Sequence, residues 1–183
     1  MFTLVTGGSG SGKSAFAEDE ILRFGQGKRI YVATMMSFDE ESRKRIARHR
    51  RMRSRKEFET LECYTGLERQ VFPDDSIVLL ECMSNLVANE MYAQGGAGKH
   101  TVEAVLRGVA SLREQARHVC VVTNEIFSDG IRYDEETRRY QQYLGTISQS
   151  LADWADRVVE VVYGIPLYLK GFLAADDGKA EKE

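Results

Sequence analysis

Cysteine is scarce in this chain, and the long apolar runs typical of membrane helices are missing. The three cysteines, Cys63, Cys82 and Cys120, are far apart and never in C-x-x-C spacing. This argues against a disulfide framework or a zinc site and favours a reducing cytoplasm. Cys82 and Cys120 lie beside or within apolar strands, so we expect small core residues rather than nucleophiles. No apolar run approaches the ~20 residues that a membrane-spanning helix needs, and the opening MFTLVTGG lacks the layout of a signal peptide.

Positive charge is also scarce outside one segment. The formal net charge is −3, yet RKRIARHRRMRSRK, residues 43–56, holds nine Lys/Arg, one histidine and no acid. Removing these nine from the 25 Lys/Arg leaves 16 against 28 Asp/Glu, a net charge of −12. Overall acidity argues against general nucleic-acid binding, so the basic segment requires a more local explanation.

Short apolar runs alternate with longer amphipathic segments, and no internal repeat is present. Most of the runs are continuously apolar, which suits strands covered on both faces of a sheet. Strands alternating with helices predict an α/β fold with a mostly parallel sheet and helices on both faces. The predicted strands are 2–6, 29–33, 76–81, 118–123 and 157–163, and the predicted helices are 13–24, 39–53, 84–93, 101–117 and 134–155.

The length predicts a single catalytic domain over residues 1–171, because a chain of 183 residues is long enough for one buried core. Within the last predicted helix, an apolar stripe at helical spacing is expected to face this core; it consists of Leu144, Ile147, Leu151 and Trp154. The segment YGIPLYL, residues 163–169, predicts a tight turn and a terminal edge strand. The polar residues 172–183 are expected to form a tail outside the domain.

A phosphate-binding motif lies between the first predicted strand and the first predicted helix. GGSGSGKS, residues 7–14, fits G-x-x-x-x-G-K-[ST] in the context that this motif requires. Its glycines let backbone N–H groups approach phosphate oxygens, while Lys13 neutralises the terminal phosphates and the Ser14 hydroxyl can ligate Mg²⁺. The motif predicts a P-loop (RecA-like) three-layer fold that binds a nucleoside triphosphate through Gly7, Gly8, Ser9, Gly10, Ser11, Gly12, Lys13 and Ser14.

Glu81 ends the apolar strand SIVLLE, at a position where P-loop proteins commonly carry an acid. Two interpretations stay open at this point. Glu81 contacts Mg²⁺ or some part of the nucleotide, or it is a strand-terminal acid in solvent. His100 and His118 lie at loop edges, and we assign them no role.

The basic segment is expected to be helical. Ser37-Phe-Asp-Glu40 has the S-x-x-E spacing of a capping box, and on the helix that would follow, Arg45, His49 and Arg53 are successive i+4 neighbours. Two guanidinium groups beside an imidazole disfavour its protonation and can also bind phosphate oxygens, which suits a histidine that attacks phosphorus. Three alternatives stay open: a solvated helix face, a patch for RNA or DNA, and an arginine lid over a kinase site.

Several motifs occur in the order found in one enzyme family. They are LVTGGSGSGKSAFAE at the start, YVAT at 31–34, RIARHR at 45–50, LLEC at 79–82, VTNEI at 122–126 and VVYGIPLYLKG at 161–171. Over nearly the whole chain this series resembles the bifunctional adenosylcobinamide kinase / adenosylcobinamide-phosphate guanylyltransferase family of cobalamin biosynthesis. The P-loop is generic, whereas the R-I-x-x-H-R segment and the strand ending in Asn-Glu are specific to that family.

The resemblance implies two reactions on one P-loop scaffold. ATP or GTP phosphorylates the aminopropanol hydroxyl of adenosylcobinamide. GTP then gives GMP to a histidine, and the substrate phosphate takes the GMP to form adenosylcobinamide-GDP. Mg²⁺ would serve both reactions, and a homotrimer is implied. The guanylylated histidine falls on His49, and the remaining nucleotide contacts fall on Thr34, Met35, Met36, Arg50, Arg51, Met52, Arg53, Glu62 and Glu81.

The sequence departs from the family pattern in two places. In RSRKEFETLE, Ser54 stands where the family often has proline, and Phe58 stands for a tryptophan, one residue later than usual. After Asn124-Glu125 the family commonly has a G-x-G turn, whereas IFSDGIRYD is longer and retains one glycine. Glu125 is a candidate base toward the substrate hydroxyl because it follows a strand's carboxyl end. The alternatives to a two-activity enzyme are a P-loop kinase alone and a nucleotide-regulated nucleic-acid-binding protein.

Overall fold

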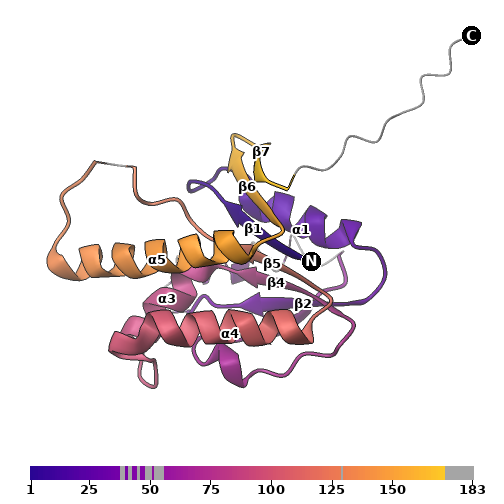
Figure 1. Cartoon of the computed structure of the whole chain (residues 1–183), viewed down its shortest axis with the longest axis horizontal. Helices are drawn as coiled ribbons and strands as arrows, with labels where there is room; N and C mark the ends of the chain where they lie inside the picture. The colour runs from indigo at the N-terminus through magenta and orange to yellow at the C-terminus, as the bar shows by residue number, and fades with distance from the viewer. Residues whose placement is uncertain are drawn as a thin grey trace, which may run out of the picture.

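A seven-stranded sheet forms the centre of the molecule (Figure 1). The computed structural model describes residues 1–37, 40, 43–44, 46–47, 51, 56–128 and 130–171. Within this part of the chain, no helix is long and apolar enough to cross a membrane. The strands are β1 Phe2–Thr6, β2 Lys28–Ala33, β3 Glu59–Glu62, β4 Ser76–Glu81, β5 His118–Val122, β6 Arg157–Val162 and β7 Ile165–Lys170. The helices are α1 Lys13–Arg23, α3 Met83–Tyr92, α4 Thr101–Gln115 and α5 Glu135–Trp154, with short 3-10 turns at Leu67–Arg69 and Gly98–His100.

The strands lie in the order β3-β2-β4-β5-β1-β6-β7. The pairs from β3 to β6 are parallel, and β7 pairs antiparallel with β6 at one edge. Because β1 lies between β5 and β6, the loop that follows it emerges from the interior of the sheet's carboxyl edge. This is where ligands bind in open α/β sheets. The predicted mostly parallel P-loop fold, with its terminal edge hairpin, is confirmed.

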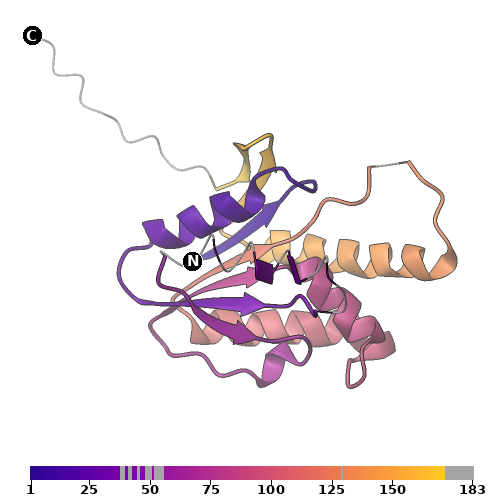
Figure 2. The ribbon, with the colours of Figure 1, turned by 180° about the vertical axis from the view of Figure 1, so that it is seen from behind.

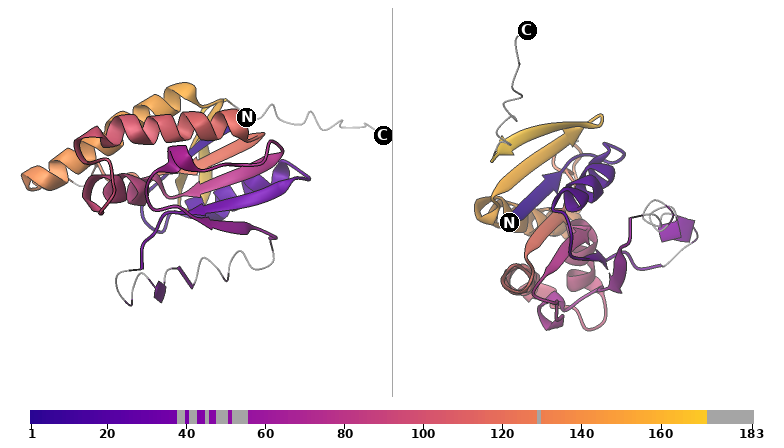
Figure 3. Two further views of the ribbon diagram at one scale, coloured as in Figure 1. Left: turned by 90° about the horizontal axis from the view of Figure 1, so that it is seen from below. Right: turned by 90° about the vertical axis from the view of Figure 1, so that its right-hand side faces the viewer.

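Helices cover both faces of the sheet, as Figure 3 shows from two sides. Helix α1 packs on one face (Figure 2). There Ala17 and Ile21 join Val5, Leu79 and Val122 in a buried cluster. Helices α3, α4 and α5 pack on the other face and against one another. Alternate strand residues serve the two clusters because successive side chains point to opposite faces of a sheet. The predicted stripe on α5 faces this core: Leu144, Ile147 and Leu151 are fully buried, and Trp154 packs against them.

The predicted elements match the observed ones to within two residues at each end, except at two places. Strand β3 was not predicted, because ETLE is polar and mostly exposed. An edge strand needs no apolar cover on both faces, so its sequence signal is weak. The predicted helix 39–53 lies largely outside the described residues, although Glu40, Arg43, Lys44, Ile46, Ala47 and Arg51 are helical.

The β6–β7 hairpin contains the predicted tight turn. Val162 pairs with Ile165, so only Tyr163 and Gly164 form the loop. Their φ angles are 51° and 80°, in the left-handed region that a two-residue type I′ turn requires at both positions. The Gly164 N–H donates to the Ser11 carbonyl at 2.8 Å, which fixes the hairpin tip against the P-loop.

Candidate active site

The P-loop forms a close backbone turn at the start of α1. Gly12 adopts a left-handed conformation with φ 95°, and no side chain caps the helix. Because glycine has no side chain, the N-cap residue does not occupy the first N–H groups of α1, and such groups bind phosphate oxygens readily. At Gly7 a Cβ atom would lie 2.5 Å from the Val161 carbonyl, so the loop can approach β6 only with glycine there. The buried Ser11 hydroxyl has no hydrogen-bond partner among the described residues, and a phosphate oxygen could supply one.

Lys13 lies inside this loop rather than in solvent. Its Nζ donates to the Gly8 carbonyl at 3.0 Å, and the residue is 8% exposed. Burial lowers the pKa of Lys13, while the nearby Cys82 and Glu81 groups act in the opposite direction. A partly desolvated ammonium gains strongly from an anionic neighbour, so a bound triphosphate would restore its charge.

Ser14 and Glu81 meet beside the P-loop. The Ser14 hydroxyl donates to Oε1 of Glu81, and the Tyr31 hydroxyl donates to Oε2 at 3.1 Å. Glu81 is only 9% exposed, which rules out the alternative of a strand-terminal acid in solvent. A hydroxyl and a carboxylate next to a phosphate cradle are the oxygen ligands that Mg²⁺ prefers, so these residues fit the ion.

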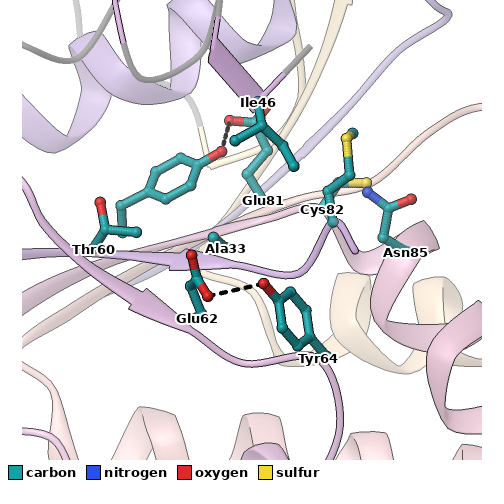
Figure 4. Close-up of a pocket in the computed structure, with 10 residues that line it drawn as sticks. Ala33, Ile46, Thr60, Glu62, Tyr64, Glu81, Cys82 and Asn85 are labelled. Atoms are coloured by element: carbon teal, nitrogen blue, oxygen red, sulfur yellow. Dashed lines mark hydrogen bonds between the residues drawn. The ribbon is translucent and has the colours of Figure 1, made fainter. Parts of the chain in front are cut away.

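Glu62 and Glu81 lie on either side of Ala33 in the sheet. Ala33 pairs with Glu62 of β3 and with Glu81 of β4, so all three side chains project from the same face. Both carboxylates line a cavity of about 70 Å³, shown in Figure 4. The Tyr64 hydroxyl donates to Oε2 of Glu62 at 2.9 Å. Other residues that line the cavity are Tyr31, Met35, Ile46, Thr60, Cys82 and Asn85.

The predicted contacts after β2 take different positions. Thr34 is fully buried, and its hydroxyl both donates to the Cys82 carbonyl and accepts from the Cys82 N–H, each at 2.8 Å. Asn89 of α3 donates to the Thr34 carbonyl at 2.8 Å. Thr34 therefore joins the ends of β2 and β4, while Met35 lines the cavity and Met36 is half-buried. Their roles toward a nucleotide stay predictions.

The basic segment reaches the site at one described residue, Ile46, and contacts α1 at another, Lys56. Ile46 lines the cavity beside Glu81. At the other end, Lys56 Nζ lies 2.9 Å from Glu18 and 3.0 Å from Asp19, both on α1. Arg51 is exposed. The predicted nucleophile His49, with Arg45, Arg50, Met52 and Arg53, lies outside the described residues.

The strand end Asn124-Glu125 lies next to the P-loop. The Glu125 N–H donates to the Gly7 carbonyl at 3.1 Å. Its carboxylate accepts from the Phe127 N–H at 2.8 Å and from the Ser128 hydroxyl at 2.7 Å. The backbone of Glu125 is thus tied to the P-loop, and its role as a base stays a prediction.

Several residues that the fold brings to the site had no role predicted from the sequence. Tyr31 belongs to a recognised motif, but its spacing alone did not show that the hydroxyl reaches Glu81. Tyr64 and Asn85 carried no local signal. Cys82 was expected in the core, yet it lines the cavity, whereas Cys120 is fully buried as predicted. Burial raises the pKa of both thiols, so neither is a ready nucleophile.

A P-loop at the carboxyl edge of a parallel sheet, with a serine and a strand-terminal acid at its helix, defines a P-loop nucleotide-binding protein. The family model for cobinamide kinase / cobinamide phosphate guanyltransferase matches residues 3–169. The chain therefore belongs to this family, which confirms the family and the enzyme class expected from the motifs.

Individual relatives agree with this assignment. The bifunctional adenosylcobalamin biosynthesis proteins CobU of Salmonella typhimurium and Escherichia coli are 32% and 31% identical to the chain, over 93% of it and 100% of their own length. CobP of Pseudomonas aeruginosa is 31% identical over 93% of the chain and 98% of its own. Among solved structures, the flagellar accessory protein FlaH from Methanocaldococcus jannaschii aligns with a TM-score of 0.48 at 12% identity, over 92% of this chain and 77% of that one.

Proposed function

We propose that this chain phosphorylates adenosylcobinamide with a nucleoside triphosphate and then transfers GMP from GTP to the product, through a guanylylated His49. The observation that carries the proposal is the presence of two acid-bearing subsites at one sheet edge. Ser14 and Glu81 meet beside the P-loop, and Glu62 lines the same cavity as Glu81. The first subsite suits a triphosphate with its metal ion, and the second suits a nucleobase.

In the kinase reaction, the P-loop N–H groups and Lys13 would hold the β- and γ-phosphates of ATP or GTP. The substrate hydroxyl attacks the γ-phosphorus, the bond to the bridging oxygen breaks, and the nucleoside diphosphate leaves. Mg²⁺, held by Ser14 and by Glu81 directly or through water, would neutralise charge on the phosphates. Glu125 would take the hydroxyl proton, after its carboxylate releases a hydrogen bond to Phe127 or Ser128.

In the guanylyltransferase reaction, a neutral His49 would attack the α-phosphorus of GTP. A P–N bond forms, the P–O bond to the β-phosphate breaks, and pyrophosphate leaves, its charge offset by Arg50, Arg51 and Arg53. A substrate phosphate oxygen then attacks the same phosphorus and frees the histidine. The position of Ile46 in the cavity supports this role, because it brings the basic segment to the nucleotide side of the sheet.

Glu62 is proposed to recognise the guanine base. Its carboxylate is exposed at the cavity, with one oxygen bonded to Tyr64. A carboxylate accepts hydrogen bonds from the N1–H and the 2-amino group of guanine, which adenine does not present together. Met35, Met36 and Met52 would pack near the nucleotide, and Thr34 would hold the strand end beside it.

We further propose a cytoplasmic homotrimer. The outer side of β7 supports self-association, because Ile165, Leu167 and Leu169 are 62%, 46% and 62% exposed at the sheet edge. A row of exposed apolar side chains on an edge strand commonly marks a contact surface. Sedimentation equilibrium on the full chain tests the assembly.

The mechanism is tested with purified protein, Mg²⁺ and GTP labelled at the α- or the γ-phosphate, without a corrinoid. We expect protein-bound α-label that is labile to acid, resistant to base and absent from His49→Ala. His100→Ala is the matched control, because His100 is exposed and outside the site. Full α-label in His49→Ala would contradict the assigned nucleophile. No α-label in the wild type, with phosphorylation of adenosylcobinamide intact, would leave a P-loop kinase with the basic segment as a lid.

A further inference from the structure

Tyr163, at the tip of the β6–β7 hairpin, has an unusual combination of exposure and backbone conformation. It is 94% exposed, the highest value for any large hydrophobic residue in the described part of the chain. Its φ of 51° lies in the left-handed region. The first position of a two-residue type I′ turn favours asparagine, aspartate or glycine, and a bulky residue there is held at a conformational cost. Since the ring is almost fully exposed, packing within the chain does not explain why tyrosine occupies this position.

The turn that presents Tyr163 is packed against the P-loop. Gly164 donates its N–H to the Ser11 carbonyl at 2.8 Å. A Cβ atom on Gly12 would lie 3.2 Å from Gly164 Cα, so glycine at position 12 is needed for this close approach. Tyr163 is the neighbour of Gly164 in the chain. Its ring therefore projects from the immediate border of the phosphate cradle.

The sheet order indicates which end of a bound nucleotide points toward Tyr163. Ser14 contacts Glu81 at the end of β4, and these two residues would hold a metal ion beside the terminal phosphates. β4 and β6 lie on opposite sides of β1, in the order β4-β5-β1-β6. With the γ-phosphate end on the β4 side, the α-phosphate, ribose and base of a bound nucleotide would extend toward β6. The first residue after β6 is Tyr163.

We propose that Tyr163 is a stacking platform for the nucleobase of the triphosphate that the P-loop holds. An exposed phenol ring offers one π-face, and stacking on such a face tolerates any base. The kinase subsite would therefore take purine nucleoside triphosphates without reading the base edge, unlike the cavity that contains Glu62. The inference rests on the proposed function in one respect, namely that a nucleoside triphosphate occupies the P-loop.

Two variants and two ligands test the platform on the full-length protein. Tyr163→Asn removes the ring but suits the turn, because Asn-Gly is a favoured type I′ pair; Tyr163→Phe keeps the ring. The probes are an ATP analogue with a non-hydrolysable imido bridge and inorganic tripolyphosphate, both with Mg²⁺, in calorimetric titrations. Binding that is lost in Lys13→Ala is assigned to the P-loop. Tyr92→Asn, at an exposed tyrosine on α3, is the matched control.

We expect Tyr163→Asn to weaken binding of the ATP analogue about ten-fold, the loss typical of one base–aromatic stack, and to leave tripolyphosphate binding unchanged. Tyr163→Phe should restore most of the affinity, and the melting temperature of Tyr163→Asn should equal or exceed that of the wild type.

Equal losses for both ligands would overturn the proposal, because they would show a change in the phosphate cradle instead. Unchanged affinity for the ATP analogue in Tyr163→Asn would also overturn it, and would leave the kinase assignment intact. If the wild type bound tripolyphosphate but no nucleoside triphosphate, both this inference and the proposed function would be wrong.

Discussion

Glu62 and Glu81 are the same residue type in the same register, yet they have different environments. Each pairs with Ala33, each lines the same cavity, and each accepts a hydrogen bond from a tyrosine. Glu81 ends a central strand, is 9% exposed and also contacts Ser14 of the P-loop helix. Glu62 ends the edge strand β3 and is exposed.

The difference shows that the position of a strand in the sheet decides which role its terminal acid is suited to. A central strand is covered on both faces, so its terminal acid is held rigidly against the phosphate cradle and suits a metal ion. An edge strand leaves its terminal acid accessible to a ligand that enters from solvent, which suits recognition of a base. If this division is correct, neutralising the two acids will have separable effects.

The largest effect is expected for Glu81→Gln. Loss of the metal-side carboxylate should lower kcat for phosphorylation of adenosylcobinamide by about 10²–10³-fold, because a positioned charge at the reacting phosphates is removed. Steady-state kinetics over a range of Mg²⁺ concentrations provide the measurement.

A matched control for Glu81→Gln is Glu90→Gln. Glu90 is 3% exposed, and its carboxylate accepts from the Gly66 and Ala97 N–H groups away from the P-loop. Its neutralisation should lower the melting temperature with kcat retained. A Glu81→Gln variant with the same behaviour would contradict the metal-side role.

A smaller and more selective effect is expected for Glu62→Gln. An amide cannot accept from both guanine donors, so the preference for GTP over inosine triphosphate in the guanylylation reaction should fall about ten- to a hundred-fold. Inosine triphosphate lacks the 2-amino group and is therefore a direct probe of this contact. Equal losses with both nucleotides would show that Glu62 makes no contact with the 2-amino group.

The smallest expected effect is the dependence of triphosphate affinity on pH. Burial lowers the pKa of Lys13 in the free protein from the ordinary value of 10.5, and bound phosphates should raise it again. Triphosphate affinity is thus complete below the lowered pKa and falls as the pH rises above it, starting earlier than for an ordinary lysine. Tripolyphosphate titrations between pH 7 and pH 10 measure this fall, on the order of a few-fold.

The pH dependence of triphosphate affinity should also differ between variants of the two acids. The Glu81 charge raises the pKa of Lys13, so Glu81→Gln should move the fall in affinity to lower pH. Glu62→Gln should not move it. A shift of equal size in both variants would mean that the two carboxylates act on the P-loop alike.

Much of this site follows from local sequence. The spacing of the glycines, Lys13 and Ser14 within residues 7–14 is typical of a phosphate-binding loop between a strand and a helix. Each residue of the cradle could therefore be predicted from the sequence. Continuous apolar runs predicted every central strand for the same reason, since only a strand covered on both faces needs them. β3 was missed because an edge strand is not subject to that requirement.

The contacts that complete the site join residues far apart in the chain, and no local pattern encodes them. Glu81 meets Tyr31 because β4 and β2 are neighbours, and it meets Ser14 because α1 packs against β4. Tyr163 lies at the P-loop because β6 pairs with β1 and the hairpin turn bonds to Ser11. The central strands, the long helices and the phosphate-binding chemistry could be read from the sequence, because these depend on backbone conformation and on burial along one segment. Only the tertiary structure decided which side chains share the cavity, because strand order and register are set by packing of the whole sheet.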